Sequence, residues 1–385
     1  MKTLLLVPDG MADYKIEDLN NQTPLAVSRT ENFNKLAKNS EVGLVRTIPL
    51  NCKPGSEIAN ATIIGQKIKK GLPRGSLECI SLGYNLKNKE VAYRVNFINV
   101  DKDLRLIDYS GGHPCDKTAN ILIDKLNKNL GIKGVKLLHS KSYRNILILQ
   151  GDGKSITYPP HDNVGRYIKD ILPRGGKENN ILLKLIFKSY EILGNEVSGI
   201  NMLWPWGGGK KPRFVNQAKR FKIKGAIISA VDLLKGIGIL SGFDVINVPG
   251  ATGFIDTDYD AKALYTIDAF KSGYDLVYLH IEAPDEASHM GNLQEKIRAI
   301  ETIDKKVLGK ILEFFENQDK KYQVLILPDH CTPIRLRVHT KAMVPYLLYR
   351  SYKKSKGVDN FNEISAERTK NIINNGWELI EKLLG

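Results

Sequence analysis

Three short, mostly apolar runs, each followed closely by an acidic residue, constrain the fold of this chain more than any other feature of its sequence. The runs cover residues 3–7, 276–281 and 324–327, and the acids that follow them are Asp9, Asp285 and Asp329, respectively. Continuous apolar runs of this length are typical of strands buried on both faces of a parallel sheet. Because ligands bind at the carboxyl ends of such strands, the three acids predict a site at that edge.

The rest of the chain predicts one α/β domain interrupted by a smaller one. Between the second acid and the third strand, apolar residues recur at helical spacing over residues 293–311, which gives the strand and helix alternation of an α/β domain. The middle of the chain instead predicts a hairpin (91–100 and 104–109), helices (117–130, 164–171 and 178–193) and strands (135–139 and 145–149). We therefore expect an α+β domain, residues 83–195, inserted into an α/β domain formed by residues 1–82 and 196–385.

Composition and charge narrow the classes of protein. The 57 Lys and Arg against 42 Asp and Glu give a net charge of +15, which attracts anions such as nucleic acid, anionic lipid or phosphorylated metabolites. The basic residues are scattered and do not form a stripe with interleaved aromatics, so we expect no nucleic-acid partner. The four cysteines include no CxxC pair, and no apolar run approaches the ~18 residues of a membrane span. These features predict a cytoplasmic protein that does not contact membranes.

Histidines near the same acids indicate a metal site. Asp285 and His289 are four residues apart, so one helical turn places them on one side of a metal ion. Asp329 is adjacent to His330, and His339 follows after a short loop. One such pair by itself is more often an exposed ion pair or a helix cap, but a group that also includes Asp9 favours metal binding. Mixed carboxylate and imidazole ligands suit Mn²⁺, Zn²⁺ or iron better than Mg²⁺.

Ser56 is a candidate nucleophile. It follows Gly55 and precedes an apolar helical stretch, where the commonest role of a serine is to cap the helix. A hydroxyl at a helix N-terminus also lies at the positive end of the helix dipole, and a divalent metal would activate it for attack. The residues alone leave both interpretations open.

Together, these segments resemble the archaeal-type 2,3-bisphosphoglycerate-independent phosphoglycerate mutases of the alkaline phosphatase superfamily. The resemblance rests on residues 6–13, 55–60, 282–289 and 328–333 with His339, and it extends to residues 204–207, 225–238 and 248–259. It implies an alkaline-phosphatase-like, mostly parallel sheet flanked by helices, with a smaller inserted α+β domain. Bacterial members of the same group have also been described as homoserine kinases, and this sequence is most similar to that branch.

The resemblance implies a two-metal phosphotransferase in which Ser56 is the phosphorylated nucleophile. The ligands that it implies are Asp285, His289 and His339 for one ion, and Asp9, Ser56, Asp329 and His330 for the other. Mn²⁺ is the expected ion, with Mg²⁺, Zn²⁺ and Co²⁺ as alternatives. Two positions depart from the family pattern, since Glu57 replaces the usual Asp and Ser288 the usual Gly. Neither departure removes a ligand.

A small phosphorylated acid is the substrate that the resemblance implies, and cations are needed to bind it. The candidate substrate-binding residues are Arg74, Arg144, His161, Asp162, Lys210 and Lys235. Lys235 falls where mutase relatives carry a substrate-contacting lysine, and His161-Asp162 resembles the family's His-Asp motif, which would handle protons on the substrate hydroxyls. The structural alternatives are a solvated surface charge for each basic residue and a turn or cap for the His-Asp pair.

The implied function is interconversion of 3-phosphoglycerate and 2-phosphoglycerate through phosphoserine, with the inserted domain acting as a lid that excludes water. The alternatives are a homoserine kinase or a small-molecule phosphatase on the same metal site, and a non-enzymatic nucleic-acid binder. Two partial nucleotide-binding motifs, at residues 153–155 and 236–238, each lack a required glycine and are expected to be turns. The sequence leaves open whether the protein is a monomer or a homo-oligomer.

Overall fold

The computed structural model describes residues 1–194 and 199–385, and the chain divides into two compact units. Unit 1 consists of Met1–Gly71 and Phe214–Gly385, and unit 2 of Leu72–Arg213. Unit 2 extends beyond both ends of the predicted insertion, residues 83–195. The reason is that helix α4 (Arg74–Ser81) and strand β7 (Met202–Gly209) both pack against strand β3 (Glu90–Val100). The expected boundary at residues 195 and 196 lies outside the described residues.

Unit 1 is built on an eight-stranded sheet with the order β13-β2-β12-β11-β1-β10-β8-β9. Its pairings are parallel except for the two made by β12, which runs antiparallel to β11 and β2. The predicted, mostly parallel sheet is therefore confirmed. The strands are β1 (Lys2–Pro8), β2 (Glu41–Val45), β8 (Gly225–Ile228), β9 (Asp244–Val245), β10 (Leu276–Ile281), β11 (Tyr322–Ile326), β12 (Val344–Arg350) and β13 (Ile372–Ile373).

The three acid-terminated runs of the sequence form adjacent strands at the centre of this sheet. β1 pairs in parallel with β10 on one side and with β11 on the other, so Leu5 is level with Tyr278 and Leu325. All of β10 and β11, and β1 from Thr3 onward, are buried. Burial on both faces explains why these runs are apolar without alternation.

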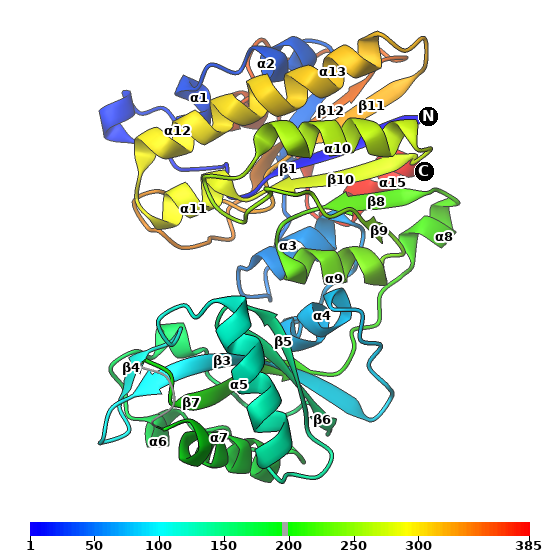
Figure 1. The fold of residues 1–385 in the computed structure, drawn as a ribbon. Helices are drawn as coiled ribbons and strands as arrows, with labels where there is room; N and C mark the ends of the chain where they lie inside the picture. The colour runs from blue at the N-terminus through cyan, green and yellow to red at the C-terminus, as the bar shows by residue number, and fades with distance from the viewer. Residues whose placement is uncertain (195–198) are drawn as a thin grey trace. The chain divides into compact units, whose positions relative to one another are not determined.

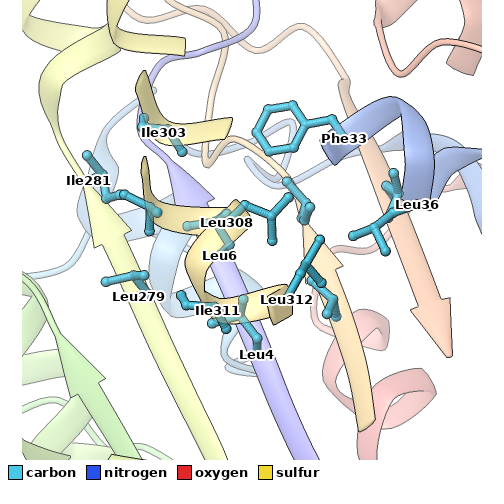
Figure 2. Close-up of a cluster of buried hydrophobic side chains, with 14 of the residues drawn as sticks. Leu4, Leu6, Phe33, Leu36, Leu279, Ile281, Ile303, Leu308, Ile311 and Leu312 are labelled. Atoms are coloured by element: carbon cyan, nitrogen blue, oxygen red, sulfur yellow. The ribbon is translucent and has the colours of Figure 1, made fainter. Parts of the chain in front are cut away.

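Helices cover both faces of the sheet of unit 1 (Figure 1). On one face, Leu4, Leu6 and Leu279 belong to a core cluster that includes residues of the helical segment 293–316, as Figure 2 shows. That segment runs without interruption through α12 (Leu293–Thr302), the π-helical turn η3 (Ile303–Leu308) and α13 (Gly309–Glu316), which confirms the helical periodicity of the sequence. The same cluster includes residues of α2 (Glu31–Ala37) and α10 (Tyr259–Lys271).

On the other side of the sheet, α9 (Asp232–Leu240) packs against β8 and β9, α3 (Ser56–Ile63) packs against α9, and α15 (Glu378–Leu384) packs against α3. The expectation that Gly236 and Gly238 form a turn is wrong, because both lie inside α9. A Cβ atom at Gly238 would lie 2.5 Å from the side chain of Ile227 on β8, so glycine lets this helix approach the sheet closely. The remaining helices of unit 1 are η1 (Glu17–Leu19), α1 (Pro24–Val27), α8 (Gln217–Phe221), α11 (Ala283–His289) and α14 (Glu363–Arg368). No helix in the described parts of the chain is long and apolar enough to cross a bilayer.

Unit 2 is an α+β unit whose sheet runs β4-β3-β6-β5, with β7 also paired to β3. Its other strands are β4 (Leu106–Asp108), β5 (Lys136–Lys141) and β6 (Arg144–Gln150), and its other helices are α5 (Asp116–Asn129), η2 (Pro160–Asp162), α6 (Ile168–Ile171) and α7 (Asn179–Leu193). The predicted hairpin, both strands and two of the three helices are confirmed. Residues 153–155 form no helix, in line with the expected turn.

Two segments of unit 2 differ from the expectation. The predicted helix over 164–171 begins only at Ile168, because backbone hydrogen bonds tie Gly165 and Arg166 to Leu106 of β4. Gly165 also has a φ of +87°, which is incompatible with a right-handed helix. Strand β7 was not predicted, since its sequence contains a proline and three glycines, which weaken the strand pattern.

The shared core of strands and helices gives a stability prediction. Leu279 is fully buried in β10, whereas Leu264 of α10 is 52% exposed. Replacing Leu279 by Ala leaves a cavity under the helices and should lower the free energy of unfolding by about 2–5 kcal/mol. The control Leu264→Ala should change it by less than about 0.5 kcal/mol. Denaturant unfolding followed by circular dichroism measures both, and similar values for the two variants would contradict this packing.

Candidate metal centre

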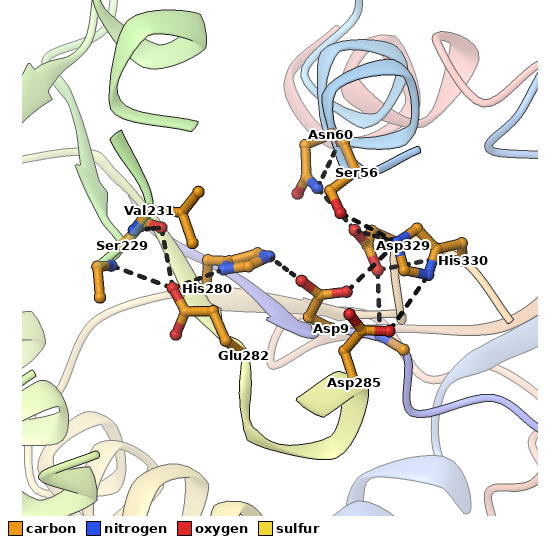
Figure 3. Close-up of polar contacts among 12 residues, drawn as sticks. Asp9, Ser56, Asn60, Ser229, Val231, His280, Glu282, Asp285, Asp329 and His330 are labelled. Atoms are coloured by element: carbon orange, nitrogen blue, oxygen red, sulfur yellow. Dashed lines mark hydrogen bonds and ion pairs between the residues drawn. The ribbon is translucent and has the colours of Figure 1, made fainter. Parts of the chain in front are cut away.

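The carboxyl ends of the central strands of unit 1 bring three acids together (Figure 3). Asp9 follows β1, Asp329 follows β11, and Asp285 lies in the short helix α11 that follows β10. The turn after β1 requires glycine, because Gly10 has a φ of +60° and a Cβ there would lie 2.4 Å from the Asp285 carboxylate. The backbone N–H of Gly10 also donates to Asp329 Oδ1 at 3.2 Å.

Asp285, His289 and His339 point at one another. His289 Nε2 lies 3.1 Å from Asp285 Oδ2 and 2.9 Å from His339 Nε2, and His339 Nε2 lies 3.4 Å from the same carboxylate oxygen. The four-residue spacing of Asp285 and His289 therefore places both on one side of α11, as the sequence predicts. Three donor atoms that converge in this way can hold one cation.

Hydrogen bonds orient two of the imidazoles. His289 Nδ1 lies 2.9 Å from the carbonyl oxygen of Arg337, and this oxygen can only accept. The Thr332 hydroxyl donates to Asp285 Oδ1 at 2.5 Å, so it accepts from His330 Nδ1, which lies 3.0 Å away. Each ring thus holds a proton on Nδ1 and directs Nε2 to the cluster of acids, an arrangement common among metal-binding histidines.

Ser56, Asp9 and Asp329 surround His330 Nε2. This nitrogen lies 3.1 Å from Ser56 Oγ, 3.5 Å from Asp9 Oδ1 and 3.4 Å from Asp329 Oδ2. The residue that caps α3 is Gly55, and Ser56 is the first residue of that helix, so its hydroxyl is directed to the cluster and does not cap the helix. Asn60, one turn later, donates to Asp329 Oδ2 at 2.8 Å and to the carbonyl oxygen of Ser56 at 2.9 Å.

His330 lies between two groups of donor atoms. Asp285, His330 and His339 offer atoms within 4.8 Å of one another, and so do Asp9, His280 and Asp329. His330 and His339 also stack, with ring centroids 3.8 Å apart. The geometry therefore brings together all seven residues of the predicted ligand sets.

His280 is the residue of this cluster that sequence reasoning missed. It belongs to β10 and is fully buried, with Nε2 3.2 Å from Asp9 Oδ2. A signal was present, because His280 is a polar residue inside a run that otherwise predicts a buried apolar strand. Its buried partners Glu282 and Lys262, which pair with each other at 2.7 Å, were also missed.

The electrostatics of the cluster fit a bound cation. Burial, together with the neighbouring Asp329 and Asp285, raises the pKa of Asp9 well above its ordinary value. Burial also lowers the pKa of His330 to about 4, which leaves the ring neutral and able to act as a ligand near neutral pH. Asp9 Oδ1 and His280 Nε2 are buried and have no hydrogen-bond partner among the described residues. Carboxylates crowded with neutral imidazoles are a donor set that suits divalent transition metals.

Asp285 and His289 form the ion pair of the cluster. Burial opposes ionisation of Asp285, but hydrogen bonds from His289 and His339 hold its pKa well below the ordinary value. The hydrogen bond to Asp285 in turn raises the pKa of His289 to about 9. In the absence of metal, His289 is thus protonated at neutral pH.

A second group of candidate residues lies in unit 2, around Trp206. The guanidinium groups of Arg94 and Arg74 lie 5.0 and 5.9 Å from its ring, and the His161 ring lies 5.2 Å from it. Burial, with help from Arg74, Arg94 and Arg144, lowers the pKa of His161 against the opposing effect of Asp162. Four of the predicted substrate-binding residues, Arg74, Arg144, His161 and Asp162, are thus electrostatic neighbours.

Arg94 belongs to this group but was not predicted. It is buried in β3, pairs with Glu78 at 3.1 Å, and its Nε atom has no hydrogen-bond partner among the described residues. An arginine within the apolar run of a buried strand was the available signal. Of the other two predicted residues, Lys210 is exposed after β7 in unit 2, and Lys235, on α9 of unit 1, pairs with Asp232 at 3.3 Å.

The ion pair predicts proton release on metal binding. The pKa of His289, raised from 6.5 to about 9, means that a cation must displace a proton at about pH 7.5. Metal affinity should therefore rise as the pH approaches 9, while the stabilisation that the ion pair gives the metal-free protein, complete below pH 6.5, is lost over the same range. Calorimetric titration with Mn²⁺ in buffers of different ionisation enthalpy should show about one proton fewer released by His289→Asn than by the parent protein. The exposed control His113→Asn should match the parent, and equal release from all three proteins would contradict the assignment.

Comparisons with known proteins agree with this geometry. A model of the metalloenzyme superfamily matches residues 1–375. The 2,3-bisphosphoglycerate-independent phosphoglycerate mutase 2 of Methanothermobacter thermautotrophicus is 39% identical over 379 residues, which cover 95% of this chain and 93% of that protein. The 2,3-bisphosphoglycerate-independent phosphoglycerate mutase of Methanothrix thermoacetophila is 40% identical over 395 residues and covers 100% of both chains.

Two solved structures share the fold along the whole chain. A protein from Pyrococcus horikoshii superposes with a TM-score of 0.82 at 26% identity and covers 99% of this chain and 96% of its own. The cofactor-independent phosphoglycerate mutase of Thermoplasma acidophilum superposes with a TM-score of 0.65 at 21% identity and covers 100% of both chains. With the match to the superfamily and the close relatives, the chain belongs to the metalloenzyme superfamily and, within it, to the family of 2,3-bisphosphoglycerate-independent phosphoglycerate mutases.

Proposed function

We propose that this protein interconverts 3-phosphoglycerate and 2-phosphoglycerate by a metal-dependent phosphotransfer through Ser56, without 2,3-bisphosphoglycerate. The observation that carries the proposal is the position of the Ser56 hydroxyl, at the start of α3 and 3.1 Å from His330 Nε2 within the cluster of acids and histidines. The relatives at 39% and 40% identity, which match nearly the whole chain, are named for this activity. The substrate is then a small phosphorylated acid, and the reaction belongs to glycolysis and gluconeogenesis.

Two divalent cations fit the cluster, and we propose that both are Mn²⁺. Asp285, His289 and His339 would hold one, while the residues around Ser56 would hold the other, namely Asp9, Ser56, Asp329 and His330. When bound, such ions neutralise charge on the transferring phosphoryl group and on the attacking and leaving oxygens. Mg²⁺, Zn²⁺ and Co²⁺ remain the alternatives for a test of metal dependence.

The transfer needs no other phosphoryl donor or acceptor. Ser56 Oγ forms a bond to phosphorus as the bond to the substrate's ester oxygen breaks, which gives phosphoserine and glycerate. The neighbouring hydroxyl of glycerate then attacks the phosphoserine, and the Ser56 hydroxyl is restored as the isomeric product forms. Asn60 holds the first turn of α3 in place for both steps, because it bonds the Ser56 carbonyl and Asp329 together.

Unit 2 supplies charges suited to the carboxylate and hydroxyl groups of the substrate. Arg74, Arg94 and Arg144 gather there, and guanidinium groups bind carboxylates bidentately. His161, whose pKa is lowered, is neutral near pH 7 and can exchange protons with a substrate hydroxyl. We propose that this unit retains glycerate and excludes water between the two transfers, since water would turn the mutase into a phosphatase.

We place the protein in the cytoplasm, because glycolysis and gluconeogenesis operate there. All four cysteines are free thiols, which agrees with a reducing compartment.

An enolase-coupled assay tests the proposal directly. With Mn²⁺ and 3-phosphoglycerate, the purified protein should form 2-phosphoglycerate without added 2,3-bisphosphoglycerate. Ser56→Ala should lower turnover by at least about 1,000-fold because it removes the nucleophile, whereas the exposed control Ser272→Ala should leave it unchanged. Absence of turnover with each of Mn²⁺, Mg²⁺, Zn²⁺ and Co²⁺, or full activity of Ser56→Ala, would contradict the proposal.

Parallel assays separate the alternative activities of the same site. Release of inorganic phosphate from 3-phosphoglycerate should be much slower than isomerisation, and homoserine with ATP should give no phosphohomoserine. A phosphatase or kinase rate above the mutase rate would reassign the function while keeping the role of Ser56.

The arginine group of unit 2 gives a separate prediction. Arg144→Gln removes one cation from the group and should raise KM for 3-phosphoglycerate roughly tenfold or more, since a hydrogen bond to a charged group contributes about 1.5–3 kcal/mol. Lys117→Gln removes the same charge from an exposed position of α5 in the same unit and should leave KM unchanged. Equal effects of the two variants would indicate a general charge effect and contradict a specific role for Arg144.

A further inference from the structure

His280 lies between two carboxylates that have different surroundings. Its ring is fully buried, with Nδ1 3.2 Å from Glu282 Oε1 and Nε2 3.2 Å from Asp9 Oδ2. Figure 3 shows the ring between Glu282 and Asp9, with a contact to each. Which ring nitrogen carries the proton therefore depends on the hydrogen bonds that each carboxylate accepts from other groups.

Glu282 is surrounded by hydrogen-bond donors. The buried ammonium of Lys262 lies 2.7 Å from Oε2, and the Ser229 hydroxyl and the Ala230 N–H each donate to Oε1 at 3.1 Å. A carboxylate that accepts from an ammonium and two further donors is an anion, so its contact with His280 requires a proton on Nδ1. Lys262 also donates to the carbonyl oxygen of His280 at 3.1 Å and thus fixes the backbone of the same residue.

With Nδ1 directed to Glu282, Nε2 is the ring nitrogen that faces Asp9. It lies 3.2 Å from Asp9 Oδ2. A cation bound beside these two atoms would interact favourably with both. Asp9 Oδ1 and His280 Nε2 both lack a hydrogen-bond partner within the described residues, and donor atoms of Asp9, His280 and Asp329 lie within 4.8 Å of one another.

We propose that His280 Nε2 is a ligand of the cation held by Asp9 and Asp329, and that Glu282 and Lys262 are positioning residues for it. A carboxylate that receives the far N–H of a metal-bound imidazole fixes both the tautomer and the direction of the ring. This assignment adds a nitrogen ligand to the set that the family resemblance implies. It rests on the proposed function only for the presence of divalent cations, and metal binding tests it without any turnover.

A matched pair of substitutions at His280 distinguishes the role of Nδ1 from that of Nε2. The amide of His280→Asn can replace the Nδ1 donor to Glu282 but has no atom near the position of Nε2. The longer amide of His280→Gln places an oxygen near that position. Equilibrium dialysis against Mn²⁺ should give two ions per chain for the parent protein and for His113→Asn, one for His280→Asn, and a second, weakened site for His280→Gln.

The positioning role has its own variant. Glu282→Gln keeps His280 but weakens the acceptor that orients it, so it should lower affinity for the second ion roughly 10–100-fold and leave the first unchanged. Thermal unfolding in the presence of a chelator identifies any variant that fails to fold before metal is added. Two Mn²⁺ bound with parental affinity in both His280→Asn and Glu282→Gln would overturn the proposal.

A spectroscopic count of ligands decides the matter even if a His280 variant fails to fold. In a protein with both His289 and His339 replaced by Ala, Mn²⁺ should occupy only the site near Asp9. Pulsed electron paramagnetic resonance with ¹⁵N-labelled histidine should then detect two coordinated histidine nitrogens, from His280 and His330. A single coordinated nitrogen would overturn the assignment, whatever the mutase assay gives.

Discussion

The repulsion among buried carboxylates at the carboxyl edge of one parallel sheet is the constraint on which the rest of this structure depends. Asp9, Asp285 and Asp329 are each at least nine-tenths buried, and they meet because β1, β10 and β11 are adjacent and parallel. Burying several anions together is costly unless cations or donors compensate them. The imidazoles around them have their Nε2 atoms directed inward, so the cluster is arranged to receive positive charge. The apolar core beneath it holds the strands in the register that this arrangement requires.

The two units divide the chemistry by the type of side chain that they offer. Unit 1 provides carboxylates, imidazoles and one serine hydroxyl, which suit cations and phosphoryl transfer. Unit 2 provides arginines around Trp206, of which Arg94 pairs with Glu78 at 3.1 Å, and guanidinium groups suit the carboxylate of an organic acid. A net charge of +15 therefore conceals an acidic centre, since the carboxylates proposed to bind metal carry the opposite sign to the chain as a whole.

Strand ends and the spacing of residues made much of the fold and of the metal centre predictable from the sequence. Continuous apolar runs identified β1, β10 and β11, and the four-residue spacing placed Asp285 and His289 together. Residues whose function depends on contacts between distant segments were harder to find, and His280 and Arg94 were missed because each lies inside a strand that reads as apolar. Strand β7 was missed because its pairing with β3 overrides a weak local pattern. The extent of unit 2 in the sequence likewise follows from pairing between segments that are far apart in the chain.

In the proposed reaction, Ser56 carries the phosphoryl group between the two positions of the substrate. Acid quenching of the Mn²⁺-loaded protein during turnover of 3-phosphoglycerate, followed by mass spectrometry of the peptide that contains residue 56, measures this most directly. We expect a phosphate adduct on Ser56 that forms within one turnover and disappears when glycerate is added in excess. Turnover without an adduct on Ser56, or an adduct on a different residue, would contradict the role of Ser56 as the nucleophile.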